Sequence, residues 1–418
     1  MIDTDSMIHP QHDPHTQHTP HAPHTSTPHI TFDVVIVRYD EIALKSPPVR
    51  RRFERIFIDR IKTSLSQNGI TYSGITEEWG RIFVHASGKD AEDTADAIAR
   101  VFGAASASPA VTTDATIESV AETACEIAIA QNHVPHATFA IRASRAGIHD
   151  FTSIDVAIAC GDAVCERTAM QVDLTSPEME IFVDMREKHA YVYTKRSPGV
   201  GGLPYGSQAR MIALISGGID SPVAAWMMMK RGVEVIPVCC DLEEFSDPQS
   251  VKQAEENIKK LWEWSRSDMT AYRVPYGTCL REIIERSDPR MICLLCKRMM
   301  YRIGEAIAEK EGACGVITGC SLGQVASQTA ENLLAEMHGL NIPIYHPLIG
   351  LDKREIIDRA IAIGTFPREK PEIECAAVPN HPKTAATVAI VQNNEDRIDV
   401  SGIVSAALAA SSVTRLQG

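Results

Sequence analysis

The stretch Ile212-Ala-Leu-Ile-Ser-Gly-Gly-Ile-Asp-Ser221 decides the fold of this chain. Its apolar first half is typical of a parallel strand that is covered on both faces. The segment after it opens with Pro222, which suits the first turn of a helix, and runs to Gly232, which suits the far end. The stretch therefore predicts a buried strand, a glycine turn and a helix.

The glycine turn is suited to binding phosphate. Gly217 and Gly218 let backbone N–H groups approach an anion at a helix N-terminus, which is positive through the helix dipole. Ser216 and Ser221 add hydroxyl donors. Asp220 would repel a bare phosphate and so indicates a Mg²⁺ ion that bridges carboxylate and phosphate. An ordinary turn is the alternative for Ser-Gly-Gly alone, but the whole context predicts a pyrophosphate-binding loop.

The same loop lacks the signatures of two other nucleotide sites. It has no Gly-Lys-Ser/Thr ending and no Gly-x-Gly-x-x-Gly, which disfavours a P-loop and a dinucleotide site. Ser-Gly-Gly-x-Asp-Ser instead resembles the PP-loop of ATP pyrophosphatases. That resemblance implies ATP and Mg²⁺ as cofactors, cleavage of ATP between its α and β phosphates, and an adenylated substrate.

Composition sets the class of protein and its compartment. The 418 residues, 44% hydrophobic and 23% charged, predict about two or three ordinary globular domains. No apolar run approaches the roughly 20 residues of a membrane span, and no signal peptide is visible. Eleven cysteines without a small disulfide framework favour a reducing compartment, the cytoplasm. The net charge of −13 argues against nucleic-acid binding by the whole surface, though not by a local basic face.

Apolar patterning predicts an α/β protein in several units. Residues 1–30 form a His- and Pro-rich tail without core residues, predicted to be disordered. A ferredoxin-like α+β unit is predicted at 31–106, a second α/β unit at 107–197, a flexible Gly/Pro linker at 198–204, a doubly wound parallel sheet at 205–396, and a tail or helix at 397–418. In the first unit we expect strands at Thr31–Arg38 and Gly80–Val84 and helices at Val49–Lys62 and Asp90–Phe102.

Several phrases together resemble the tRNA 4-thiouridine synthetases, or tRNA sulfurtransferases. They are Arg38-Tyr-Asp-Glu-Ile-Ala-Leu-Lys45, Phe139-Ala-Ile-Arg-Ala-Ser-Arg145, Ser321-Leu-Gly-Gln-Val-Ala-Ser-Gln328 and Pro347-Leu-Ile-Gly-Leu-Asp-Lys353. The resemblance implies an RNA-binding THUMP domain at 107–197, a PP-loop domain at 205–396, and thiolation of a tRNA uridine at position eight by a homodimer. The chain's end at Gly418 matches the form without a C-terminal rhodanese domain, which leaves a role in thiamine synthesis doubtful.

The resemblance also implies which residues bind ATP. They are Leu214, Ile215, Ser216, Gly217, Gly218, Asp220, Ser221, Cys239, Cys240, Lys297, Gly319 and Gln328. The family has other residues where this chain carries Cys239, Cys240 and Cys320, so the alternative for the vicinal pair is a buried strand end with inert thiols.

Replacing a carbonyl oxygen by sulfur needs a leaving group and a sulfur nucleophile. Adenylation of the uridine O4 supplies the first, with release of pyrophosphate and then AMP, and a persulfide or cluster-bound sulfide supplies the second. Cys375 lies in a segment that matches the family's catalytic cysteine, and with Asp220, Cys293 and Cys296 it completes the expected catalytic set. Two alternatives stay open: Cys293, Cys296 and Cys375 hold a [4Fe–4S] cluster, or Cys375 carries a persulfide that one of the pair resolves. The sulfur donor is sulfide or the persulfide of a cysteine desulfurase.

Basic residues gather where the resemblance places tRNA. They are Arg50, Arg51, Arg52, Arg55 and Lys62 on the first helix, Arg142 and Arg145 in the THUMP-like strand, and Lys195 and Arg196 before the linker. Such residues position a folded RNA through its phosphates, although each could also simply solvate an exposed face. Two other functions remain: a PP-loop enzyme that adenylates a small molecule or another RNA base, and a non-catalytic RNA-binding protein.

Overall fold

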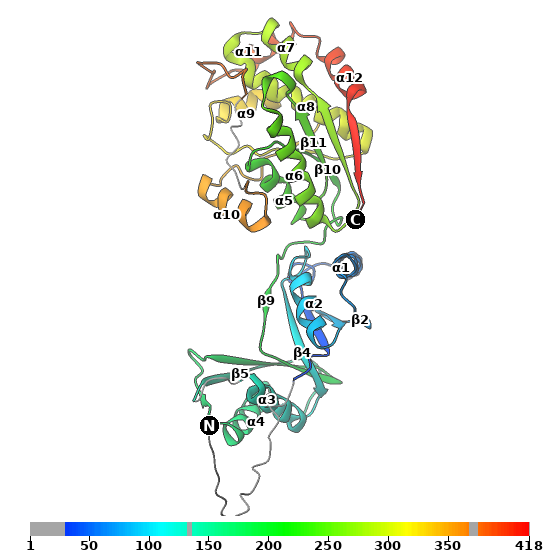
Figure 1. The fold of residues 1–418 in the computed structure, drawn as a ribbon, viewed down its shortest axis with the longest axis vertical. Coiled ribbons are helices and arrows are strands. Elements are labelled where there is room, and N and C mark those ends of the chain that lie inside the picture. Colours follow the sequence, from blue (N-terminus) through cyan, green and yellow to red (C-terminus); the bar gives the residue numbers. More distant parts are fainter. Residues whose placement is uncertain (1–29, 132–135, 368–374, 418) are drawn as a thin grey trace, which may run out of the picture.

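Two β-sheets organise the computed structural model, which describes residues 30–131, 136–367 and 375–417 (Figure 1). Within these residues the first sheet has nine strands in the order β2-β3-β1-β4-β8-β7-β5-β6, with β9 paired to β4. The strands are β1 (Val34–Arg38), β2 (Gly74–Glu78), β3 (Arg81–His85), β4 (Ser106–Asp114), β5 (Thr138–Arg145), β6 (Gln171–Val172), β7 (Met179–Met185), β8 (His189–Tyr193) and β9 (Ser197–Pro198). The helices are α1 (Pro47–Gln67), α2 (Lys89–Ala99), α3 (Ile117–Gln131) and α4 (Ser153–Arg167). Apart from Ile30, the predicted tail lies outside the described residues.

Strand β4 joins the two N-terminal units into one sheet. Its first half, Ser106–Ala110, pairs with β1, and its second half, Val111–Asp114, pairs with β8. The sequence analysis did not predict this strand because Ser-Ala-Ser-Pro-Ala-Val-Thr-Thr-Asp begins with small residues and a proline, which depress strand propensity. The predicted boundary at residues 106 and 107 falls at the start of this shared strand.

The first two helices show where local pattern holds and where packing overrides it. On α1, Phe53, Phe57 and Ile61 are buried, which confirms the predicted apolar stripe. Helix α2 ends at Ala99 and not at Phe102, so that prediction was wrong. The reason is tertiary: the Phe102 ring packs against Trp226 and Trp264 of the C-terminal domain, with ring centroids 5.6 and 5.7 Å away.

The second sheet confirms the predicted doubly wound α/β domain. Its order is β14-β13-β10-β11-β12-β15, and every neighbouring pair is parallel except β12 and β15. The strands are β10 (Arg210–Leu214), β11 (Glu234–Asp241), β12 (Met269–Pro275), β13 (Val316–Ile317), β14 (Ile344–Tyr345) and β15 (Ser412–Leu416). The helices are α5 (Asp220–Met229), α6 (Pro248–Ser265), α7 (Gly277–Arg286), α8 (Ile292–Glu311), α9 (Ala330–Met337), α10 (Lys353–Ile363), α11 (Val388–Glu395) and α12 (Val400–Ala410). None of the described helices is both long and apolar enough to cross a bilayer.

The C-terminal segment is more structured than a tail or a helix. Helix α12 is followed by β15, which adds an antiparallel edge strand beside β12. A five-residue strand of Ser, Val, Thr, Arg and Leu carries too short a pattern to be told from a tail by sequence alone.

The predicted linker at 198–204 is hydrogen-bonded to both of the parts that it connects. Gly201 N donates to Ala104 O at 2.7 Å, and Leu203 N donates to Lys230 O at 2.9 Å. A Cβ on Gly202, whose φ is +82°, would lie 2.1 Å from Lys230 O. Glycine here permits close approach of two backbones, so the linker segment contacts both the N-terminal sheet and the C-terminal domain.

Candidate active site

The loop between β10 and α5 is held by its own serine hydroxyls. Ser216 N donates to Ser221 Oγ at 2.9 Å, and the two serine Oγ atoms are 3.0 Å apart. Gly218 N donates to Ser216 Oγ at 3.3 Å. The hydroxyls that are predicted to donate hydrogen bonds to phosphate therefore also stabilise the conformation of the loop.

Helix α6 fixes the other side of this loop. A Cβ on Gly217 would lie 2.7 Å from Ser250 O, so only glycine allows this approach. The buried side chain of Asn257 donates to Ser216 O at 3.0 Å and to Gly218 O at 3.4 Å. Sequence reasoning missed Asn257, because nothing local distinguishes it from the surface amides of an amphipathic helix. Among the described residues, only Ser216 Oγ lies within 4 Å of the position that a Cβ on Gly218 would take, so this is the open face of the loop.

Asp220, the predicted Mg²⁺ ligand, lies at the first position of α5. Its Oδ1 accepts from Lys353 Nζ at 2.8 Å, and its Oδ2 accepts from Gln324 Nε2 at 2.9 Å. Both partners belong to stretches that the sequence analysis quoted, but neither was predicted to be a site residue. They bring the segment after β13 and the start of α10 to the start of α5.

The segment after β13 packs directly on the loop. A Cβ on Gly319 would lie 2.7 Å from Ser221 N and 2.8 Å from the carbonyl carbon of Asp220. Gln328 is buried and its Oε1 accepts from Ser321 N at 3.3 Å, so it shapes this segment from within. The two predicted ATP residues therefore occupy one loop, with Gly319 against the N-terminus of α5.

The predicted adenosine neighbours differ in exposure. Ile215 and Cys239 are buried in the core, whereas Leu214 and Cys240 are partly buried. Burial raises the pKa of Cys239 to about 12 and that of Cys240 well above its usual value. Both thiols are therefore uncharged near neutral pH, as thiols packed against apolar neighbours are.

Three thiols gather near the N-terminus of α8. Cys293 and Cys296 lie in the first turns of α8, and Cys375 is near enough to raise the pKa of both. Burial is the larger cause and raises the pKa of Cys296 to about 12. Ala376 N donates to Phe245 O at 2.9 Å, which holds the segment of Cys375 in place. The preceding residues of this motif, 368–374, lie outside the described residues.

The donor chemistry of this thiol group matches an iron–sulfur cluster, because such clusters are held by cysteine thiolates. The described part of the chain nevertheless contains no group of three His, Cys, Asp or Glu side chains arranged to hold a metal ion. The structure therefore supports a common location for the three thiols.

Helix α8 connects the thiols to the loop. Lys297, one residue after Cys296, has its Nζ 3.6 Å from the Sγ of Cys320, which follows Gly319. The next residue, Arg298, is 2% exposed, forms an ion pair with Glu395 at 2.7 Å and donates to the carbonyl of Glu336 at 2.9 Å. This buried pairing anchors α8 to α9 and α11, so the thiols and Lys297 are carried by a fixed element.

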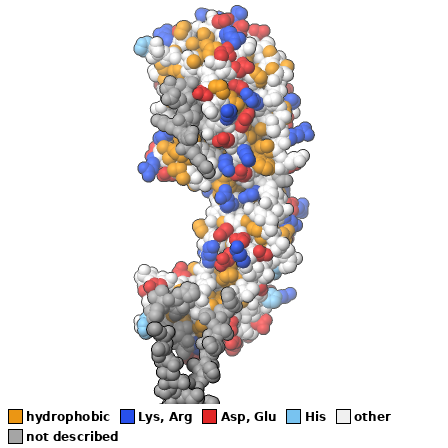
Figure 2. Space-filling view, viewed as in Figure 1, with side chains coloured by type: hydrophobic (Ala, Val, Ile, Leu, Met, Phe, Trp, Pro, Cys, Tyr) orange, Lys and Arg blue, Asp and Glu red, His pale blue; other side chains and the backbone are white. Residues whose placement is uncertain are grey.

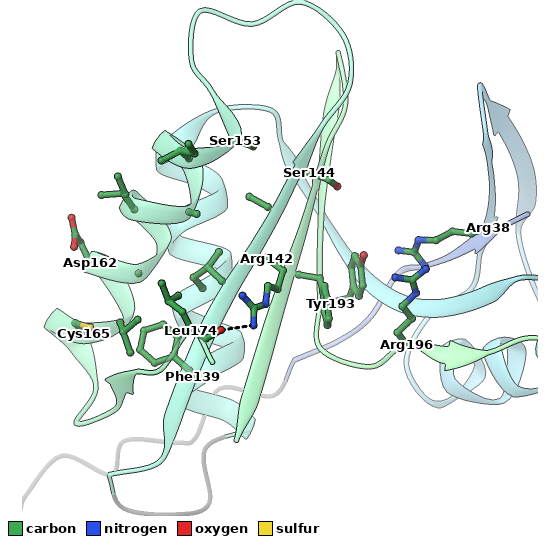
Figure 3. Close-up of a pocket in the computed structure, with 18 of the residues that line it drawn as sticks. Arg38, Phe139, Arg142, Ser144, Ser153, Asp162, Cys165, Leu174, Tyr193 and Arg196 are labelled. Carbon is green, nitrogen blue, oxygen red and sulfur yellow. Dashed lines mark hydrogen bonds between the residues drawn. The ribbon is translucent and has the colours of Figure 1, made fainter. Parts of the chain in front are cut away.

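A second candidate site lies on the first sheet, where a pocket of about 780 Å³ is lined by residues of α4, β5 and neighbouring strands (Figure 3). Arg38, Arg81, Arg142, Arg196 and Tyr193 line it together with apolar side chains of α4. Arg38 is only 5% exposed, stacks 4.8 Å from the ring centroid of Tyr193, and has an Nη2 without a partner among the described residues. Burial lowers its pKa, as expected for a cation removed from water.

The predicted RNA-binding residues outside α1 have different partners. Arg142 lines the pocket, with its Nε 2.8 Å from Glu180 Oε1. Lys195 pairs with Asp96 at 3.4 Å, and Arg145 donates to His149 O at 3.3 Å.

The basic residues of α1 lie at the junction with the catalytic domain. Arg52 donates to Ser207 O at 3.3 Å, and Arg50 lies 3.8 Å from Glu54, whereas Arg51 and Arg55 are exposed. Figure 2 shows Lys and Arg side chains at the narrow waist of the molecule. Arg142 and Arg196 thus line the pocket, whereas Arg50, Arg51, Arg52 and Arg55 on α1 form a second group, the waist set.

Comparison with known proteins agrees with this architecture. The family model described as Thiamine biosynthesis protein (ThiI) matches residues 206–400, the ThiI ferredoxin-like domain matches 34–108, and the THUMP domain matches 114–195. The probable tRNA sulfurtransferases of Methanosarcina mazei and Methanosarcina acetivorans are 48% and 45% identical to this chain. Each alignment covers 92% of the chain, and 96% and 94% of the respective relative.

A solved structure supports the same assignment. The crystal structure of a 4-thiouridine synthetase–RNA complex with bound ATP superimposes with a TM-score of 0.81 at 28% identity. The match covers 92% of this chain and 100% of that chain. Because the domain order, the PP-loop and near-full-length relatives agree, the chain belongs to the ThiI family of tRNA sulfurtransferases.

Proposed function

We propose that this protein transfers sulfur to tRNA in an ATP-dependent reaction that converts a uridine, at position eight, to 4-thiouridine. The observation that carries the proposal is helix α8, which bears Cys293, Cys296 and Lys297 and so links the thiol group to the loop beside Gly319. The relatives' names and the RNA- and ATP-bound structural neighbour agree with it.

The PP-loop would bind the phosphates of ATP at the start of α5. Asp220 would hold Mg²⁺ together with phosphate oxygens, since Mg²⁺ is usually bound by one or two carboxylates and substrate phosphates. Lys353 would then leave Asp220, with which it pairs in this structure, and bind phosphate itself. Attack of the uridine O4 on the α phosphate releases pyrophosphate and makes AMP the leaving group at C4.

Cys375 is the proposed sulfur carrier. Its position beside Cys293 and Cys296 supports either of two forms of sulfur, a persulfide on Cys375 resolved by a neighbouring thiol or sulfide held by an iron–sulfur cluster on the three cysteines. Burial raises the pKa values of Cys293 and Cys296 even though the nearby charge of Lys297 lowers them, so neither is a thiolate near neutral pH.

The direct test is to purify the protein anaerobically and incubate it with unmodified tRNA, Mg-ATP and sulfide. Nucleosides from the digested tRNA are then analysed by mass spectrometry. We expect 4-thiouridine, with AMP formed in equal amount. Iron content and visible absorbance of the same sample show whether an iron–sulfur cluster is present. A persulfide on Cys375 would instead require a cysteine desulfurase in place of sulfide. ATP binding without thiolation from either donor would favour a PP-loop reaction on another substrate.

The pocket lined by Arg38, Arg142, Tyr193 and Arg196 would bind part of the tRNA. Its arginines, the partnerless Nη2 of Arg38 and the ring of Tyr193 suit a phosphate and an unstacked base. This pocket and the PP-loop lie in different parts of an elongated molecule, which supports a homodimer whose two protomers share one tRNA (Figure 1). Light scattering of the purified protein with and without tRNA tests that state.

The waist set gives a testable contribution to tRNA binding. The double substitution Arg51→Glu and Arg55→Glu should weaken tRNA binding at low salt and reduce the slope of log K against log salt by about 2, because each exposed arginine neutralises about one phosphate. Binding is measured by fluorescence anisotropy from about 50 to 200 mM salt. Arg354→Glu on α10, 83% exposed at its side chain, is the matched control, and ATP binding should be unchanged in both. If the slope of log K against log salt is the same in the two variants, α1 is not part of the RNA interface.

A further inference from the structure

A buried polar cluster lies behind the nucleotide loop. Glu336 on α9 is fully buried, and its Oε1 has no partner among the described residues. Its Oε2 accepts from Tyr301 OH at 3.5 Å, and Tyr301 OH lies 3.8 Å from Cys320 Sγ. Cys320 Sγ in turn lies 3.6 Å from Lys297 Nζ. A carboxyl group is therefore connected to the proposed ATP-binding lysine through the side chains of Tyr301 and Cys320.

The groups that face Glu336 come from every element packed against it. Lys297, Tyr301 and Cys293 face it from α8, and Cys320 faces it from the loop after β13. Arg298 donates to its backbone carbonyl, but its charge is paired with Glu395. His346, whose Nδ1 lies 2.7 Å from Thr318 Oγ1, faces Lys297 from the loop after β14.

Burial and the neighbouring charges have opposite effects on the pKa of Glu336. Burial raises its pKa to about 8, and among its neighbours Lys297 gives the largest opposing effect, because an ammonium stabilises the carboxylate. Burying a carboxyl group costs folding free energy, and acids with strongly shifted pKa values cluster at functional sites. The ionisation of Glu336 therefore depends on how much of the Lys297 charge is available to it.

We propose that Glu336 is a positioning residue of the ATP site that takes up a proton when ATP binds beside Lys297. The proposal rests on the proposed role of Lys297 in contacting ATP. Phosphate oxygens would share the ammonium charge that otherwise stabilises the Glu336 carboxylate. A proton from solvent then binds the carboxylate, and no other bond forms or breaks. The neutral Glu336 no longer attracts the Lys297 ammonium, whose charge then interacts with the nucleotide.

Proton linkage gives the sign of the effect. Below the pKa of about 8 Glu336 is already protonated, so ATP binding changes little. Above it, each ATP must draw a proton, so affinity falls as pH rises. We expect Mg-ATP to bind about three- to tenfold more weakly at pH 9 than at pH 7, and in Glu336→Gln the affinity should be nearly independent of pH over this range.

Isothermal titration calorimetry of Mg-ATP binding tests the proposal in two buffers that differ in ionisation enthalpy. The difference in measured heat gives the number of protons taken up. We expect uptake in the wild type at pH 8 to 9 and none in Glu336→Gln. Glu331→Gln, an exposed carboxylate on the same helix, is the control and should behave as the wild type. Thermal unfolding checks that each variant is folded.

Each outcome that contradicts the proposal can be distinguished from the others. Equal proton uptake in the wild type and Glu336→Gln overturns the proposal, as does ATP binding by the wild type without any uptake at pH 8 to 9. Should Glu336→Gln fail to fold, the wild-type pH profile decides: burial lowers the pKa of His346 below its usual value, so uptake only below about pH 6.5 assigns the proton to His346 and overturns the role of Glu336. If the wild type does not bind Mg-ATP, the proposed nucleotide site is wrong, and so is the proton linkage that depends on it.

Discussion

Replacing Cys375 by serine should reduce the formation of 4-thiouridine by about a thousandfold or more while ATP binding stays close to that of the wild type. A serine hydroxyl neither forms a persulfide nor binds iron as a thiolate does, so both forms of the proposed sulfur chemistry are lost. The change is nearly isosteric, and the hydrogen bond from Ala376 N to Phe245 O involves only backbone atoms. The local fold should therefore survive. Mass spectrometry of tRNA nucleosides and calorimetry of Mg-ATP binding measure the two effects.

Cys314→Ser is the control for this experiment, because Cys314 is an exposed thiol in the connection between α8 and β13. It should retain wild-type thiolation. If Cys375→Ser also retained it, the sulfur carrier would have to be another thiol, with Cys293 and Cys296 as the next to be replaced. AMP formation in Cys375→Ser tells whether adenylation proceeds without sulfur, which a sequential mechanism predicts.

The nucleotide loop was predictable because its signals are local. Ser216, the two glycines and Asp220 lie within five consecutive residues between an apolar run and a helix start, and the structure has β10, the loop and α5 in these places. The same holds for the α1 stripe, whose spacing is set by the helix period. Patterns of this kind state which face is buried, but not what lies against it.

The partners of the site residues were not predictable, because they are set by tertiary packing. Lys353 pairs with Asp220 across 133 positions, and Asn257 holds the loop from a different helix. Glu336 reads in sequence as one more polar residue of a short helix, and only its burial beneath α8 distinguishes it. The pairing of strand β4 and the backbone contacts of the linker were not predictable for a related reason, since small residues and glycines do not show in sequence which backbone lies against them.

The second large effect is expected for Gly319→Ala, which should weaken Mg-ATP binding by about a hundredfold or more. The added methyl group would lie 2.7 Å from Ser221 N, 2.8 Å from the carbonyl carbon of Asp220 and 2.9 Å from Ser221 Cα. All three atoms are backbone, so no side chain can move aside. The segment after β13 must retreat from α5, or the N-terminus of α5 must shift, and either displaces groups that would hold phosphate.

Gly350→Ala is the matched control, because no atom of the described residues lies within 4 Å of a Cβ at Gly350 and its φ is not positive. It should bind Mg-ATP as the wild type does. Gly319→Ala should also lower the free energy of unfolding by about 1 to 3 kcal/mol, measured by denaturant titration. Equal ATP affinity in the two variants would place the nucleotide away from the start of α5. If Gly319→Ala loses ATP binding and Cys375→Ser keeps it, activation of the uridine and delivery of sulfur are separate functions, joined by α8.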